Sequence, residues 1–412
     1  MLDRPKILFL AHLVPWPLTG GGQIKTYHTL RLLSERYDIT LLALTRHKKI
    51  DAPENMTAAQ NLHTFGERIA LATINRNVLS NPVNAAVALA CGESFLVRRD
   101  YSRHAMYTIK CLLSEQHYAA IHVDHLQMAQ YVPEWLPSLR PRIVLDQHNV
   151  EHRIPERLAA APDASPLLRW YAGIETPKLR AYETAALRRA DLTLAVSDAD
   201  RRAFLELAPE LENKIETVPI GVDTDYFAVA PREPSANAIL SIGTMSWLPN
   251  VDALTYFAAD ILPLIRARKP DVQTLIVGAK PAPGIIALAR RDSHITVTGT
   301  VEDVRPYAKQ CGVFIVPLRA GSGVRVKILA ALSMGLPVVS TTLGAEGIAV
   351  THGENILIAD TPAAFADAVL AVLNDPALAA RLGAHGRALV EERYTWEVVG
   401  RRLLTVYDRL LE

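Results

Sequence analysis

A short stretch in the second half of the chain places glycines and two cations at the start of an expected helix. Gly321, Ser322 and Gly323 follow an apolar run, and Arg325 and Lys327 come directly after them. Backbone N–H groups at a helix N-terminus bind anions, whereas cations are unfavourable there unless an anion is present. The stretch predicts a phosphate site. The alternative is a solvated helix start that carries two surface bases.

A second glycine loop lies near the beginning of the chain. Gly20, Gly21 and Gly22 stand between an apolar run and a helical pattern. Successive glycines let a backbone approach a ligand closely. The pattern is not GxGxxG, so the motif by itself is weak. Both a ligand-binding loop and a purely structural turn fit it.

Polar side chains also follow the apolar run 143–146. His148 and Asn149 stand at the expected carboxyl end of this strand, which is where ligands bind in parallel sheets. We expect both residues to face a ligand. A lone histidine, however, is more often structural, and that interpretation stays open.

Four histidines have a spacing that could suggest a zinc site. The residues that would form it are His122, His125, His148 and His152. The chain has no HExxH motif here and no cysteine partner, so we expect no metal. Two Asp-x-Asp triplets, 198–200 and 223–225, are expected to be a helix start and a turn rather than metal ligands.

The wider pattern alternates short apolar runs with longer amphipathic ones. We expect strands at 6–12, 39–44, 119–124, 143–146, 192–196, 238–242, 274–277, 295–297, 313–316 and 337–341. We expect helices at 23–36, 181–189, 251–267, 301–310, 363–373, 376–392 and 395–411. Such alternation predicts α/β architecture with parallel sheets covered on both faces.

At 412 residues the chain is too long for one ordinary core. The interval 228–237, AVAPREPSAN, has the composition of a linker. It separates an expected N-terminal domain, 1–227, from an expected C-terminal domain, 238–392. We expect the last segment, 393–412, to form a helix that packs back on the first domain.

Composition restricts the environment and the partners. A formal net charge of +1 argues against a nucleic-acid binder. Three widely spaced cysteines favour a reducing cytoplasm. No run approaches about 18 apolar residues, and the run 7–11 is too short for an export signal. A basic region within 66–117 fits either contact with an anionic membrane surface and a lipid-linked acceptor or a solvated helix face; its cations are Arg98, Arg99, Arg103, His104 and Lys110.

Several motifs, in their order and spacing, resemble the retaining glycosyltransferases of family 4. They include PLTGGGQIKTYHTLRLL, VSDADRRAF, VPIGVDTDYF, SIGTMSWLPNVDAL and GTVEDVRPYAKQCGVFIVPLRAGSGVRVKILAALSMGLPVVSTTLGAEGI. The resemblance implies the GT-B fold, in which two Rossmann-like, doubly wound parallel-sheet domains face each other across a cleft. VDHLQMAQYV and DQHNVEHR resemble the branch associated with bacterial exopolysaccharide and cell-surface sugar assembly.

The resemblance also implies a reaction and its residues. A sugar would pass from a nucleotide diphosphate to a hydroxyl of a glycan or glycolipid, with retention and without a metal or other cofactor, on the cytoplasmic side of the membrane. Arg325, Lys327 and His148 would act in catalysis, and Asn149 would lie on the acceptor side. The residues expected to bind the donor are Gly21, Gly22, Gly243, Gly321, Ser322, Gly323, Ala330 and Glu346.

One hallmark of the family is changed. Its two glutamates, separated by seven residues, align with Ser322 and Ala330. The second glutamate normally binds the ribose hydroxyls, and its loss would cost about 1.5–3 kcal/mol of nucleotide binding. Three explanations stay open: an active enzyme that holds the ribose differently, a substituted variant, or a paralogue that binds without catalysing. A different GT-B enzyme, such as an epimerase or a phosphorylase, is a further alternative.

Overall fold

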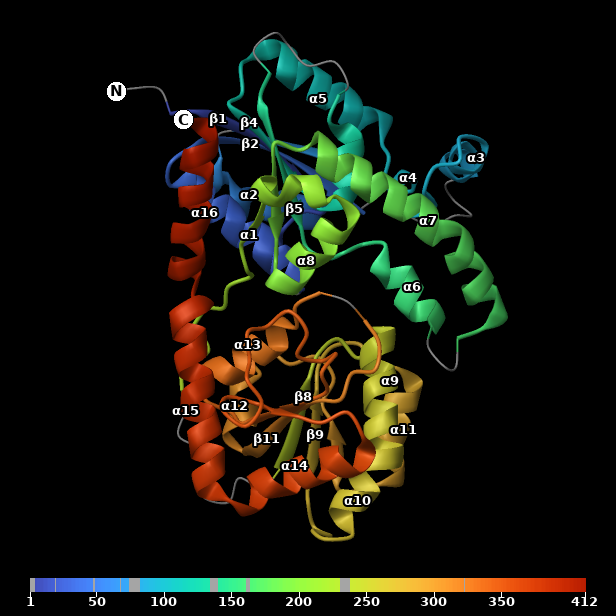
Figure 1. Ribbon diagram of the computed structural model, residues 1–412, viewed down its shortest axis with the longest axis vertical. Helices are drawn as coiled ribbons and strands as arrows, with labels where there is room; N and C mark the ends of the chain where they lie inside the picture. The colour runs from blue at the N-terminus through green and yellow to red at the C-terminus, as the bar shows by residue number, and fades with distance from the viewer. Residues whose placement is uncertain are drawn as a thin grey trace. The chain divides into compact units, whose positions relative to one another are not determined.

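The computed structural model describes residues 4–18, 20–46, 49–66, 68–73, 82–133, 140–160, 164–229, 238–321 and 323–412 (Figure 1). The chain divides into two compact units. Unit 1 is Met1–Pro219 with Gly400–Glu412, and unit 2 is Ile220–Val399. The division falls before the interval 228–237 that we expected as the linker, and of that interval only 228 and 229 lie within the described residues.

Unit 1 is built on a seven-stranded parallel sheet with the order β3-β2-β1-β4-β5-β6-β7. Its strands are β1 (Lys6–Ala11), β2 (Asp38–Thr45), β3 (Arg68–Thr73), β4 (Ala120–Asp124), β5 (Arg142–Gln147), β6 (Leu192–Ala195) and β7 (Ile215–Thr217). From β1 the chain adds strands toward one edge, and it then returns to add the rest beside β1. The order therefore reverses between β1 and β4.

Helices connect these strands. They are α1 (Gly21–Ser34), α2 (Pro53–Leu62), α3 (Pro82–Ala90), α4 (Phe95–Arg98), α5 (Arg103–Glu115), α6 (Arg153–Ala160), α7 (Pro166–Arg189) and α8 (Asp198–Leu207), with 3-10 segments η1 (His63–Phe65), η3 (Leu126–Tyr131) and η4 (Pro209–Lys214). The helix expected at 181–189 begins much earlier, because Ser165 caps it by accepting the Leu168 N–H at 3.2 Å. Gly173 and Pro177 concealed its helical pattern.

Unit 2 contains a six-stranded parallel sheet with the order β10-β9-β8-β11-β12-β13. Its strands are β8 (Ala238–Ile242), β9 (Thr274–Val277), β10 (Ile295–Val297), β11 (Cys311–Val316), β12 (Val338–Ser340) and β13 (Leu357–Ile358). Here the order reverses between β8 and β11. Two doubly wound parallel sheets confirm the predicted α/β class.

The helices of unit 2 are α9 (Leu248–Tyr256), α10 (Leu262–Arg266), α11 (Pro283–Arg291), α12 (Arg305–Lys309), α13 (Val326–Ser333), α14 (Pro362–Asn374) and α15 (Pro376–Arg393). A continuous helix over 251–267 was expected, but a π-helical segment, η5 (Phe257–Ile261), separates α9 from α10. Pro263 is the second residue after this segment and has no N–H to donate to the preceding turn, which accounts for the change of register.

The last helix, α16 (Trp396–Leu411), leaves unit 2 and joins unit 1 from Gly400 onward. Within unit 1, the Tyr407 hydroxyl lies 2.6 Å from His122 Nδ1, and Asp408 accepts a hydrogen bond from the Tyr37 hydroxyl at 3.0 Å. A Cβ on Gly400 would meet Leu32 of α1 at 2.5 Å. These contacts fix α16 against β4, α1 and the segment that follows α1.

Among the described residues, no single helix is long and apolar enough to span a membrane. Within these same residues, one bent pair, α14 and α15, which meet at 101°, satisfies the length and composition of a span when its two helices are taken together.

Candidate functional site

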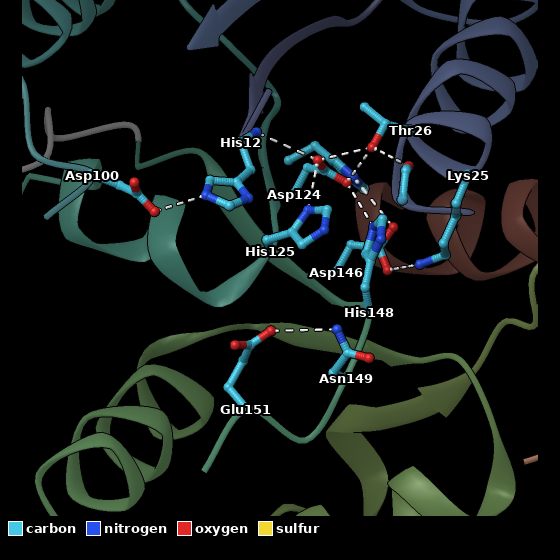
Figure 2. A network of polar contacts seen from close by, with 12 residues as sticks. His12, Lys25, Thr26, Asp100, Asp124, His125, Asp146, His148, Asn149 and Glu151 are labelled. Atoms are coloured by element: carbon cyan, nitrogen blue, oxygen red, sulfur yellow. Dashed lines mark hydrogen bonds and ion pairs between the residues drawn. The ribbon is translucent and has the colours of Figure 1, made fainter. Parts of the chain in front are cut away.

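In unit 1, polar side chains gather at the carboxyl ends of β1, β4 and β5 (Figure 2). His12 follows β1, Asp124 ends β4 and is followed by His125, and His148 comes just after β5. β1 and β4 flank the reversal of strand order, and doubly wound sheets bind ligands beyond the strand ends at that point. Topology therefore brings these side chains together at a ligand-binding position.

Asp124 is the centre of this cluster. Its carboxylate accepts hydrogen bonds from His148 Nε2 at 2.8 Å, from His125 Nδ1 at 3.0 Å and from the Thr26 hydroxyl at 3.0 Å. The side chain is fully buried. Burial by itself would raise the pKa of Asp124, but the charges and hydrogen bonds of His125 and His148 together hold it well below its usual range. Asp124 is thus an anion at neutral pH.

The ionised Asp124 fixes the tautomer of His148. Burial, followed by the charges of His125 and Lys25, lowers the pKa of His148 to about 3, so the ring is neutral at pH 7. Because Asp124 can only accept, the single ring proton lies on Nε2, and Nδ1 keeps a lone pair. His148 Nδ1 is therefore left as a hydrogen-bond acceptor.

His125 lies beside His148, with ring centroids 3.6 Å apart. Burial lowers the pKa of His125, but the Asp124 carboxylate outweighs burial, and the net pKa is raised. The pKa values of the two rings are therefore shifted in opposite directions, although both rings contact the same carboxylate. One offers an acceptor nitrogen, and the other favours the protonated form.

The glycine loop faces these rings. A Cβ on Gly22 would lie 3.4 Å from His125 Nε2 and 3.8 Å from His148 Nδ1. Helix α1 starts at Gly21 without a side-chain cap. The structure thus brings the predicted Gly21, Gly22 and His148 together. Asn149, the residue predicted on the acceptor side, is half-buried, and its amide lies 3.4 Å from Glu151 Oε1.

A buried ion pair supports the cluster from α1. Lys25 donates to Asp146 at the end of β5, and both side chains are almost fully buried. Burial would raise the pKa of Asp146, but the Lys25 charge is the largest of the opposing influences, and the net pKa is lowered. No sequence motif singled out Lys25, Asp124 or Asp146, or predicted that His125 lies beside the ring of His148. The polar residues that end the apolar runs of β4 and β5 were the available signal.

The four histidines weighed as zinc ligands separate in the structure. His125 and His148 share Asp124, His122 contacts Tyr407, and His152 Nδ1 lies 2.6 Å from Glu183 on α7. Among the described residues, two groups have ligand atoms within 4.8 Å of one another: Asp124, His125 and His148, and His122, Asp124 and Asp146. All of these side chains are engaged in the hydrogen bonds and ion pairs described above. The prediction that no metal is needed stays a prediction.

Unit 2 presents the predicted phosphate loop beyond the carboxyl end of β11, beside the reversal point of its sheet. Gly321 has φ +119° and Gly323 has φ +82°, in the left-handed region that favours glycine. Ser322 lies outside the described residues. Helix α13 begins at Val326, with Arg325 as its N-cap and without a side-chain cap hydrogen bond.

Arg325 and Lys327 both lie at this helix start. The Arg325 side chain is 5% exposed and donates to the Gly323 carbonyl. Lys327 Nζ donates to Asn250 Oδ1 at 2.9 Å. Burial, and then the charge of Arg325, lowers the pKa of Lys327 to about 7. Two cations held in this way repel each other, and an anion would relieve the repulsion.

Gly243 belongs to the same region. It follows β8, and a Cβ there would lie only 2.8 Å from the amide nitrogen of Asn250. Asn250 also donates to the Thr244 carbonyl at 3.0 Å, which orients its Oδ1 toward Lys327. A side chain at Gly243 would therefore clash with Asn250, the residue that positions Lys327.

The two remaining predicted residues lie on neighbouring elements of unit 2. Ala330 is half-buried on α13, one turn beyond Lys327. Glu346 is half-buried in the turn 342–347, which follows β12 at the carboxyl end of the sheet. The predicted residues thus form two groups, one in each unit.

Comparison with known proteins agrees with these features. The model of Glycosyltransferase Family 4 matches residues 19–226, and that of Glycosyl transferases group 1 matches residues 236–375. The chain is 32% identical over 228 residues to the phosphatidyl-myo-inositol mannosyltransferase of Mycobacterium tuberculosis, an alignment that covers 52% of this chain and 58% of that protein. The chain thus matches little more than half the length of this relative.

Solved structures share the fold at low identity. Sucrose-phosphate synthase from Thermosynechococcus elongatus aligns with a TM-score of 0.70 and 18% identity, covering 99% of each chain. Anabaena HepE in complex with UDP and glucose aligns with a TM-score of 0.62 and 14% identity, covering 98% of this chain and 99% of that one. The first family model spans half of the sequence, and both sheets are doubly wound and parallel. The chain therefore belongs to glycosyltransferase family 4 and has the GT-B fold.

Proposed function

We propose that the protein is a retaining glycosyltransferase that moves a sugar from a nucleotide-diphosphate donor to a hydroxyl of a glycan or lipid-linked sugar. The observation that carries this proposal is the placement of Arg325 and Lys327 at the uncapped start of α13, beside the reversal point of a doubly wound sheet. Family membership supports the reaction class. The relatives, which include a mannosyltransferase and a protein solved with UDP and glucose, support the type of donor.

The donor diphosphate binds at the glycine loop of unit 2. Gly321 and Gly323 leave the backbone open to it, and the N-terminal end of α13 contributes a positive dipole. Arg325 and Lys327 neutralise the negative charge that develops on the leaving group. Fixed cations and dipoles take the role that a divalent ion has in other sugar transferases, so the reaction needs no metal.

Transfer proceeds on the front face of the sugar. The acceptor hydroxyl attacks the anomeric carbon from the side of the leaving group, and the bond from that carbon to the phosphate oxygen breaks. The departing phosphate takes the hydroxyl proton, so no nucleophile from the protein is consumed. His148 Nδ1 accepts a hydrogen bond from a sugar hydroxyl and holds the ring in the reactive position. Cell-surface sugar assembly at the cytoplasmic face of the membrane is the pathway class that we propose.

The test removes both cations. Arg325→Gln with Lys327→Gln should weaken UDP or GDP binding by about a hundredfold or more, because each charged contact contributes about 1.5–3 kcal/mol. Calorimetry measures nucleotide binding, and a panel of nucleotide sugars measures transfer. Arg290→Gln with Lys309→Gln is the matched control, since both are exposed cations of unit 2. Unchanged turnover in the Arg325 and Lys327 variant would refute the proposal.

Ala330 supports a second candidate, a protein that binds nucleotide sugars without catalysing transfer. A glutamate at this position would restore a ribose ligand and tighten nucleotide binding by about tenfold to a hundredfold. If the silent interpretation is right, Ala330→Glu binds the nucleotide tightly but neither transfers nor hydrolyses it. Transfer by the natural chain excludes this candidate, and turnover without any acceptor would indicate an epimerase.

A further inference from the structure

A cavity of about 710 Å³ lies in unit 1 between α4, α5, η3 and α7. It is lined by different residues from those of the histidine cluster. Among the described residues that line the cavity, the basic ones outnumber the acidic. The basic residues are Arg98, Lys110, Lys178 and Arg189, and the acidic residue is Glu93. An excess of one charge within a concave, low-dielectric surface favours a ligand of the opposite charge. The cavity is therefore suited to an anion larger than inorganic phosphate.

Buried hydrogen bonds hold the cavity walls together. Glu175 on α7 is 3% exposed, and it accepts the Leu96 N–H at 2.9 Å and the Ser94 hydroxyl proton. This carboxylate fixes the start of α4 on α7. The Tyr131 hydroxyl of η3 donates to the Asp100 carbonyl at 2.6 Å and accepts from the Ser102 N–H at 2.7 Å. These contacts make the cavity preformed, which lowers the entropic cost of binding.

Some hydrogen-bond donors that line the cavity have no acceptor among the described residues or only a distant one. Arg98 stacks on Tyr101 at 4.2 Å and lies 3.7 Å from Glu93, and its buried Nε has no hydrogen-bond partner among the described residues. Lys178 Nζ reaches the Glu93 carbonyl at 3.5 Å, a long contact. Burial raises the pKa of Tyr182, so its hydroxyl remains a donor. A phosphate would satisfy such donors with charge-assisted hydrogen bonds.

An exposed apolar stripe leads to this cavity along α7. Leu167, Trp170 and Ile174 are 72%, 64% and 44% exposed, and their spacing places them on one face of the helix. The same face continues to Lys178 and Ala181, which line the cavity. Trp170 and Lys178 are about 12 Å apart along the helix axis. One face of α7 thus presents apolar side chains first and cations next.

We propose that this cavity binds the phosphate of a lipid phosphate ester with a net negative charge, with the apolar part of that lipid lying along the α7 stripe. Free phosphate would engage the cations alone, and a lipid without net charge would engage the stripe alone. The inference rests on the proposed function only where it identifies this lipid as the sugar acceptor. Binding is measured without turnover, so failure of sugar transfer and failure of lipid binding are distinguishable.

The experiment titrates three probes into the full-length protein by calorimetry: dihexanoyl phosphatidylglycerol below its micellar concentration, dihexanoyl phosphatidylcholine, and inorganic phosphate. We expect phosphatidylglycerol to bind at least about tenfold more tightly than either other probe. Arg98→Gln with Lys178→Gln should weaken this binding at least about tenfold. Leu167→Gln with Trp170→Gln should weaken it as much and leave the affinity for inorganic phosphate within about twofold.

The control is Arg180→Gln with Arg202→Gln, two exposed cations of unit 1 that do not line the cavity. It should bind phosphatidylglycerol like the natural chain, and circular dichroism checks the folding of each variant. Equal affinity for the two lipids, or for phosphatidylglycerol and inorganic phosphate, would overturn the proposal. If a variant unfolds, the salt dependence of binding by the natural chain still tests the proposal. Raising the KCl concentration from about 50 to about 300 mM should weaken phosphatidylglycerol binding, because salt screens the charges. An affinity that does not change with salt would overturn the proposal.

Discussion

At the scale of single residues, the cluster in unit 1 depends on one buried carboxylate. Asp124 orients two imidazole rings and one hydroxyl, and it does so as an anion despite complete burial. The rings alone could adopt either tautomer. Asp124 makes His148 a neutral ring with a lone pair on Nδ1. It is therefore a positioning residue, whereas His148 is the residue that contacts the sugar in the proposed reaction.

Asp124→Asn should lower kcat by about a hundredfold and leave the donor KM nearly unchanged, because an amide no longer fixes the His148 tautomer. His148→Ala should cause a similar loss. The double variant should be no worse than either single one, since the two residues act as a unit. Steady-state kinetics of all three variants measures this coupling. Additive losses would show that Asp124 acts independently of His148.

Lys327 predicts how nucleotide binding depends on pH. Its pKa of about 7 means that the ammonium is present below pH 7 and is progressively lost above it. A bound diphosphate favours the charged form and raises the pKa, so binding takes up a proton. Affinity for UDP should therefore fall by up to about tenfold per pH unit between about pH 7 and pH 9. Calorimetry in buffers of different ionisation enthalpy detects the proton uptake.

Two substitutions of Lys327 test whether this residue is the group that causes the pH dependence of nucleotide binding. Lys327→Arg should keep the charge and remove the slope, because the guanidinium does not titrate in this range. Lys327→Gln should lower the affinity at every pH and also remove the slope. A slope that persists in either variant would assign the titration to another group.

At the scale of elements, helix α13 is held in place by a close approach of α15. A Cβ on Gly383 would lie 2.2 Å from the Gly335 carbonyl oxygen, and one on Gly386 would lie 2.6 Å from Leu332. Backbone contact at Gly383 leaves no flexible side chain that could move aside. The predicted phosphate loop is attached to the other end of α13, so this packing also sets the position of Arg325 and Lys327.

Gly383→Ala should therefore lower the free energy of unfolding by about 1–3 kcal/mol, as overpacked cores do. It should also weaken UDP binding, because α13 must shift. Gly173→Ala on α7 is the matched control, since nothing lies within 4 Å of its added Cβ. That change should be neutral or stabilising by up to about 1 kcal/mol. Chemical denaturation measures both variants, and equal stabilities would contradict the packing argument.

At the scale of the whole molecule, the chain leaves unit 1 after Pro219 and returns to it at Gly400. The returning residues of α16 complete the interior of unit 1. Tyr407 is fully buried against His122, and its ring is 5.8 Å from that of Tyr37. Unit 1 is thus formed from segments separated by all of unit 2, and it cannot be completed before the residues of α16 are synthesised.

Tyr407→Phe should lower the stability of unit 1 by about 1–3 kcal/mol, because it leaves the buried His122 Nδ1 without its partner. Hydrogen exchange followed by mass spectrometry should show faster exchange in β1, β4 and α1, with little change in β9 and β10 of unit 2. Tyr107→Phe, at a residue 69% exposed, is the control and should change neither unit. Uniform loosening of both units would refute the localised role of α16.

Much of the fold was predictable because its signals are local. Apolar runs of three to seven residues, alternating with helical patterns, identified most strands and the α/β class. The pattern failed where local signals conflict, as in α7, whose exposed apolar residues and internal proline concealed a helix of 24 residues. It also failed at β3 and β13, where edge strands are short or only partly buried.

The sequence by itself determined the two-sheet α/β class and the family, and it predicted a phosphate loop in unit 2, because each of these signals is encoded within a few tens of consecutive residues. The tertiary structure alone decided which side chains share a carboxylate. Asp124 meets His148 across 24 residues and Thr26 across 98, and Lys25 meets Asp146 across 121. It also formed the basic cavity and its apolar approach on α7. Such contacts depend on strand order and helix placement, which no local pattern contains.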